Sequence, residues 1–142
     1  MTNTSRIWMA VCAVLAAALG LDMALYAQST TAGVYTAAQA KRGTALYTEQ
    51  CASCHGDDLK GSDIIPGLTG ETFMADWQGK SLGDLFEKIE VTMPALDPGS
   101  LKPPQTADLI AYILSVAKYP AGNTDLASSQ DALQQIKIDA VK

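Results

Sequence analysis

Cys51 and Cys54 are followed directly by His55, the only histidine of the 142-residue chain. Together these residues form a C-x-x-C-H motif, the signature for covalent attachment of haem c. The spacing suits this chemistry, because two thiols one helical turn apart can each add to a vinyl group on the same porphyrin edge. The next residue then turns its imidazole toward the iron. The motif therefore predicts one covalent haem attached to Cys51 and Cys54, with His55 as an iron ligand.

The first 27 residues have the organisation of a secretory signal peptide. Arg6 and the amino terminus supply positive charge, Ile7 to Leu21 is apolar throughout, and small and polar residues follow at Ala27-Gln28-Ser29. This apolar run is shorter than the roughly 20 residues needed to cross a bilayer. We therefore expect cleavage after Ala27 and export to the periplasm, although Leu25 departs from the small residue usual at the −3 position. The alternative is an uncut segment that anchors the protein in a membrane.

Three other uses of the motif compete with haem attachment. A structural zinc site needs four ligands, but cleavage would remove Cys12 and leave two cysteines and one histidine. A thioredoxin-like redox pair is expected in a βαβ setting, and no such pattern is visible. A plain disulfide is compatible with export but leaves His55 unexplained.

The charge balance limits the partners. Because Arg6 and Asp22 would be removed together, the exported chain keeps the formal net charge of −5. An acidic chain is a poor match for nucleic acid or an anionic membrane surface, so a membrane is expected only if the N-terminal segment stays uncut. It suits a redox partner with a basic face. Lysines are interspersed among the acidic residues expected to flank the haem, which are Asp57, Asp58, Asp63, Asp76, Asp84, Glu87 and Asp97.

Hydrophobic periodicity and capping residues predict four helical segments: Thr36 to about Gln50, Ser81 to at least Ile89, Thr106 to just before Pro120, and an amphipathic stretch from Ser129 to Lys142. Capping boxes are expected at Thr36 with Gln39 and at Ser81 with Asp84, and Thr106 is expected to cap the third helix. Loops rich in glycine and proline separate these helices, and no strand pattern is found. Helices linked by long loops leave a small core that a large apolar cofactor would complete.

The second protein ligand of the iron has to come from a side chain other than that of His55. The chain has no second histidine, so a methionine sulfur is the natural donor. Cleavage would leave Met74 and Met93. Met93 lies beyond the second helix and precedes Pro94, which fixes the backbone there. Met74 follows Phe73 in a segment typical of packing at the edge of a loop.

These residues lie in a pattern that resembles the class I cytochrome c family. The pattern comprises Ala40-Lys41-Arg42-Gly43-x-x-Leu46-Tyr47, Cys51-x-x-Cys54-His55-Gly56, Pro66-x-Leu68-x-Gly70, Trp77, Thr92-Met93-Pro94 and Asp108 to Leu114. The resemblance implies an all-α cytochrome c fold, with three core helices plus loops around one covalent haem. The domain organisation it implies is a signal peptide (1–27), a linker (28–35), a cytochrome c domain (36–118) and a C-terminal extension with a short amphipathic helix (119–142).

The resemblance also implies roles for single residues. It favours Met93 over Met74 as the sixth ligand of the iron. Pro66 would accept the Nδ1 hydrogen of the axial histidine through its carbonyl oxygen, the alternative being an ordinary turn proline. Leu68 would belong to the same haem-binding stretch. Trp77 would stack near a haem propionate, the alternative being a core-filling side chain.

The packing of the helices is implied in the same way. Gly43 would allow a close crossing of the first and third helices, with Tyr112 packing at the crossing. The extension beyond Tyr119 would either dock a partner or fold back on the domain's own surface.

A narrower set of residues is similar to monohaem cytochromes found beside, or fused to, quinoprotein dehydrogenases. These residues are Leu59-x-Gly61, Phe73-x-x-x-Trp77, Met93-Pro94 and Pro98-Gly99-Ser100-Leu101. The similarity implies a respiratory-chain electron carrier, not an enzyme, that links a periplasmic dehydrogenase or a quinol-oxidising complex to a terminal oxidase. The alternatives are a haem c subunit of a dehydrogenase complex, and a catalytic or gas-sensing haem protein. The last needs a vacant or labile sixth site, which Met93 argues against.

Overall fold

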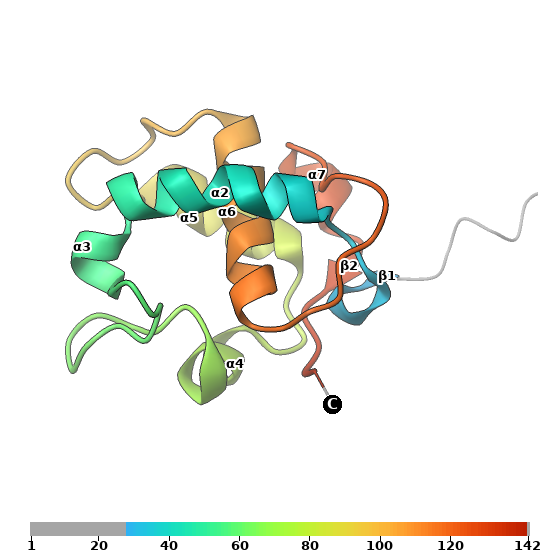
Figure 1. Ribbon diagram of the computed structural model, residues 1–142, viewed down its shortest axis with the longest axis horizontal. Helices are drawn as coiled ribbons and strands as arrows, with labels where there is room; N and C mark the ends of the chain where they lie inside the picture. Colours follow the sequence, from blue (N-terminus) through green and yellow to red (C-terminus); the bar gives the residue numbers. More distant parts are fainter. Residues whose placement is uncertain (1–27, 142) are drawn as a thin grey trace, which may run out of the picture.

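The computed structural model describes residues 28–141, so the expected signal peptide (1–27) and Lys142 lie outside the described residues. Figure 1 shows a mostly helical structure, as expected for the all-α class. Its elements are β1 (Gln28–Ser29), the 3-10 helix η2 (Thr30–Ala32), α2 (Ala37–Gln50), α3 (Ala52–His55), α4 (Gly70–Trp77), α5 (Leu82–Thr92), α6 (Pro103–Val116), α7 (Gln130–Leu133) and β2 (Ile136–Lys137).

The crossing of α2 and α6 is the centre of the fold (Figure 1). Gly43 of α2 faces Asp108 and Tyr112 of α6 so closely that a Cβ there would lie 2.8 Å from the Cβ of Tyr112. Tyr47, one turn further along α2, packs its ring against Tyr112 with 5.1 Å between the centroids. The predicted close crossing at Gly43, with Tyr112 beside it, is confirmed.

The starts of α2 and α5 follow their capping residues. Thr36 Oγ1 accepts from the Gln39 N–H at 3.0 Å, but the Gln39 side chain pairs with the backbone of Leu126 instead of completing the box. Only half of the first predicted capping box is therefore present. At α5 the box is complete, because Ser81 Oγ accepts from the Asp84 N–H and Asp84 Oδ2 accepts from the Ser81 N–H.

The predicted start of the third helix is wrong. Helix α6 begins at Pro103, whose fixed φ suits the first helical position and whose missing N–H costs nothing there. Gln105 Oε1 accepts from the Lys102 N–H at 2.9 Å and satisfies the backbone at this end. Thr106 consequently lies inside the helix, and its buried hydroxyl has no hydrogen-bond partner in residues 28–141. The end of α6 before Pro120 is as predicted.

Helix α4 was expected to be loop-like and is the main addition to the predicted helices. It is eight residues long, and Thr69 at its N-cap makes no side-chain hydrogen bond, so neither length nor capping marks it in the sequence. Phe73 is the residue that it buries in the core. Met74, expected at a loop edge, therefore lies on a helix.

The C-terminal extension folds back over the domain, which is one of the two alternatives considered from the sequence. Leu126, Leu133, Ile136 and Ile138 are all buried in the core. The expected amphipathic helix from Ser129 to Lys142 is limited to α7, because the chain then becomes extended as β2. Strand β2 pairs in parallel with β1, Gln28 opposite Ile136. Two-residue strands are too short to show alternation in a sequence, so the sheet was not predicted.

Candidate haem site

The C-x-x-C-H motif forms one tight helical turn at the end of α2. Cys51 joins α2 to α3, and its carbonyl oxygen accepts from the N–H groups of Cys54 and His55 at 3.1 and 2.9 Å. Both thiols are free, Cys51 half-buried and Cys54 exposed. Burial raises the pKa of the Cys51 thiol to about 11, and the neighbouring Cys54 adds to the shift. The turn thus presents two unpaired thiols and one imidazole from adjacent positions.

The imidazole of His55 is buried and oriented by the loop that follows it. Its Nδ1 lies 2.9 Å from the carbonyl oxygen of Pro66. A carbonyl oxygen can only accept, so Nδ1 carries the hydrogen and the neutral ring keeps the lone pair on Nε2. This is the tautomer that a metal-binding histidine adopts when a backbone carbonyl holds its other nitrogen.

Backbone contacts in residues 56–69 bring Pro66 to this position. The Gly61 N–H donates to the His55 carbonyl oxygen at 2.9 Å, and the Leu68 N–H donates to the Leu59 carbonyl oxygen at 2.8 Å. Gly61 has φ of 70°, and a Cβ there would lie 2.7 Å from the carbonyl carbon of Pro66, so both conformation and space favour glycine. Leu59 is fully buried, and Leu68 packs against the core beside it.

The end of the motif is held by α2. The Tyr47 hydroxyl donates to the Gly56 carbonyl oxygen at 2.6 Å, directly after His55. Burial is the largest cause that raises the pKa of Tyr47, so this donor stays protonated over the physiological range. Tyr47 therefore links the α2–α6 crossing to the turn that carries the histidine.

The two candidate methionines lie in different surroundings. Met93 is the C-cap residue of α5, where its N–H donates to the Ile89 carbonyl oxygen at 2.9 Å, and it is half-buried. Met74 is also half-buried, but its Sδ lies 3.5 Å from the hydroxyl of Tyr119 in the C-terminal extension. The sulfur of Met74 is thus in contact with a polar group of the chain itself.

Trp77 ends α4 between an aromatic ring and a cation. Its ring stacks on Phe73 with 6.2 Å between the centroids, and the Lys80 Nζ lies 4.9 Å from its ring centroid. The indole is half-buried and packs against the core. Its buried part therefore fits the alternative of a core-filling side chain. Lys80 is one of the lysines expected among the acidic residues that flank the haem, but its contact with Trp77 was not predicted, because the only signal for it is a position three residues after the tryptophan.

A family model described as subunit III of the cbb3-type cytochrome c oxidase matches residues 38–113, more than half of the chain. The chain belongs to this cytochrome c family. Membership confirms the family resemblance and the helical cytochrome c fold, and it implies covalently bound haem c and a role in electron transfer.

Two known proteins are similar to this cytochrome. The fructose dehydrogenase cytochrome subunit of Gluconobacter japonicus is 34% identical over 105 residues, which cover 67% of this chain and 22% of that protein. The chain thus spans less than a quarter of the length of this relative. The crystal structure of the sulfane dehydrogenase SoxCD from Paracoccus pantotrophus superposes with a TM-score of 0.54 at 24% identity. That match covers 72% of this chain and 53% of the other, and it shows the fold.

The donor set fits haem c. The vinyl groups need two free thiols one turn apart, which Cys51 and Cys54 provide. The iron needs an imidazole nitrogen and a soft second donor. His55 offers its Nε2, and Met74 and Met93 are the methionines of the described residues. The groups of the described residues therefore match the requirements of the cofactor that the family implies.

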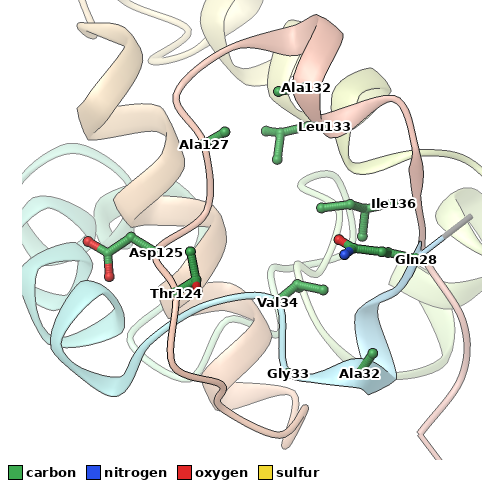
Figure 2. Close-up of a pocket in the computed structure, with 10 residues that line it drawn as sticks. All are labelled: Gln28, Ala32, Gly33, Val34, Thr124, Asp125, Ala127, Ala132, Leu133 and Ile136. Carbon is green, nitrogen blue, oxygen red and sulfur yellow. The ribbon is translucent and has the colours of Figure 1, made fainter. Parts of the chain in front are cut away.

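A cavity of about 340 Å³ lies away from these residues, between the 28–34 segment and the extension (Figure 2). Its lining is mainly alanine, valine, leucine and isoleucine. Asp125, its charged lining residue, is already paired with Arg42 at 2.7 Å. The cavity offers no free charge that would orient a ligand.

Within residues 28–141, no helix has the length and apolar character needed to cross a membrane.

Proposed function

We propose that this protein is an exported cytochrome c that carries one haem and moves single electrons between a dehydrogenase, or a quinol-oxidising complex, and a terminal acceptor. The observation that carries the proposal is the hydrogen bond between His55 Nδ1 and the Pro66 carbonyl oxygen, beside two free thiols of the same helical turn. It leaves the Nε2 of a buried, oriented imidazole available to a metal.

In this proposal, Cys51 and Cys54 would hold the haem through thioether bonds, and His55 and Met93 would ligate the iron. The contact of Met74 with Tyr119 supports the choice of Met93, because it gives the Met74 sulfur a place in the chain's own packing. The bound haem supplies a one-electron redox centre. Because two side chains of the protein would ligate the iron, no substrate is expected to reach it, and the chain would act as a carrier and not as an enzyme.

The surrounding residues shape the site. Pro66 orients the imidazole. Leu68 would contribute apolar surface, and Trp77, with Lys80 beside it, would lie against the haem near a propionate. Exclusion of water by such side chains raises the reduction potential, as methionine ligation does. Residues 1–27 would direct export and be removed, which leaves the segment 28–35, the cytochrome c domain at 36–118 and the extension at 119–142.

The partner class is inferred from the relative. The fructose dehydrogenase cytochrome subunit supports a dehydrogenase as the electron donor. A second candidate function follows from the same similarity: the chain is a permanent haem c subunit of a dehydrogenase complex. Co-purification of a tagged chain from its native periplasm distinguishes these candidates, because a subunit stays bound through gel filtration and a diffusing carrier elutes alone.

Covalent attachment tests the proposal directly. The chain is produced with the cytochrome c maturation machinery, extracted with acid and acetone, and stained for haem after denaturing electrophoresis. Cys51→Ala combined with Cys54→Ala should abolish the stain. Ser53→Ala, an exposed change between the two cysteines, is the matched control and should keep it. A double variant that still retains haem would contradict the attachment.

A further inference from the structure

The short turn between α4 and α5 is paired with the C-terminal extension. We call the described part of this extension, residues 119–141, the strap. The Gly79 N–H donates to the Ile138 carbonyl oxygen at 2.8 Å, and the Ile138 N–H donates to the Lys80 carbonyl oxygen at 2.9 Å. Ser81 continues this pairing as an isolated antiparallel bridge to Lys137. The exposed turn directly after Trp77 is thus held in place by a segment about 60 residues further along the chain.

Gln134 of the strap extends this pairing to the start of α5. Its Oε1 accepts from Ser81 Oγ at 2.7 Å, and its Nε2 donates to Asp84 Oδ1 at 3.3 Å. These are the two residues of the capping box. Gly83 leaves the space that the amide group needs, because a Cβ there would lie 2.8 Å from the Gln134 Cδ. Gln134 is therefore built into the first turn of α5.

The strap is itself fixed by the core. Leu133, which directly precedes Gln134, and Ile138, which pairs with the turn, are 0% exposed. Upstream, the Tyr119 hydroxyl donates to the Asp139 carbonyl oxygen at 2.7 Å and lies beside Met74 of α4. The strap consequently contacts α4 in its middle, the turn after α4, and the start of α5.

We propose that Gln134 is a positioning residue of the haem site, which keeps Trp77 in its place by fixing the turn that follows it. The proposal rests on the function proposed above, in which Trp77 lies against the haem. Cys51, Cys54 and His55 belong to the frame of α2, α3 and α6, which this contact does not touch. Loss of the Gln134 contact is therefore expected to move one wall of the site and leave the haem attached.

The fluorescence of Trp77 tests this inference. Trp77 is the single tryptophan once residues 1–27 are removed, and Trp8→Phe gives the same condition in a chain that retains them. In the haem-loaded protein its emission should be quenched by energy transfer to a nearby haem. Gln134→Ala removes two hydrogen bonds and should raise the population of the displaced turn by roughly fivefold or more. We expect increased Trp77 emission and a shifted reduction potential, with the haem content unchanged. Gln135→Ala, an exposed change at the next residue, should match the parent.

A second variant approaches the same contact from the helix. Gly83→Ala would place a Cβ 2.7 Å from the Gln130 carbonyl oxygen, and it should change emission and potential in the same direction. If both variants lower the urea midpoint but keep the emission and potential of Gln135→Ala, the strap is only a stabilising element and the inference is wrong. Failure of the proposed function looks different, because a parent protein without haem would show unquenched Trp77 in every variant.

Discussion

Replacing Gly43 by alanine tests the close crossing of α2 and α6. The added Cβ would lie 2.7 Å from the carbonyl carbon of Asp108 and 2.8 Å from the Cβ of Tyr112. Ordinary carbon–carbon contacts are about 3.5–4.0 Å, so the two helices would have to separate by roughly 1 Å. Overpacking against backbone costs about 3 kcal/mol, at the upper end of the usual range. Alanine returns about 1 kcal/mol as the better helix former, which leaves a net loss of about 2 kcal/mol in the free energy of unfolding.

Urea unfolding of the haem-loaded protein, followed by circular dichroism, measures this loss. With a slope of about 2 kcal/mol per molar urea, the midpoint should fall by about 1 M. Thr44→Ala is the matched control, because Thr44 is the next residue of α2 and is exposed. Its midpoint should stay near that of the parent, since surface changes are usually worth less than about 0.5 kcal/mol. A Gly43→Ala protein as stable as the parent, or more stable, would refute the close-packing argument.

Four further outcomes are expected. Met93→Ala should remove the weak near-infrared sulfur-to-iron band of the oxidised protein and lower the reduction potential, whereas loss of the band in Met74→Ala alone would reverse the ligand assignment. The pKa of Asp125 is held below its usual value by hydrogen bonds from Thr36 and from a guanidinium. The parent should therefore be more stable than Asp125→Asn above roughly pH 4 in urea titrations, and this advantage should disappear as the pH falls through the lowered pKa. Higher ionic strength should slow stopped-flow electron transfer from a basic partner and leave the potential nearly unchanged, while a flat profile would exclude steering by an acidic face. Mass spectrometry of the exported protein should give a chain that starts near Gln28, and an intact N-terminus in the membrane fraction would show an anchor instead.

The features that could be predicted from the sequence are local ones. Ser81 and Asp84 satisfy each other across three residues, so the start of α5 follows from its own sequence. The C-x-x-C-H motif likewise needs one helical turn, and its chemistry is contained in five residues. The pattern of caps and apolar positions therefore predicted α2 and α5 well.

The features that could not be predicted depend on distant partners. Gln39 was expected to complete a capping box, but its amide pairs with Leu126, which is 87 residues away. Nothing near Met74 in the sequence indicates that Tyr119 will lie beside its sulfur. The start of α6 is a different case, because two signals competed locally, and the fixed φ of Pro103 determined the first turn in place of the hydroxyl of Thr106. Contacts of the extension thus account for most of what the sequence did not reveal.

The pairing of β1 with β2 determines how this cytochrome would sit on a surface. Strand β1, which begins at Gln28, lies at one end of the described part of the molecule, and α3, which follows Cys51 and contains Cys54, lies at the other end (Figure 1). A linker attached ahead of Gln28 would therefore leave the turn proposed to carry the haem directed away from the surface to which the linker is fixed. If the protein is fixed to an electrode by such a linker, direct electron exchange with the electrode should be slow, and the turn should stay accessible to a dissolved redox partner. A linker introduced near Cys54 should reverse this preference.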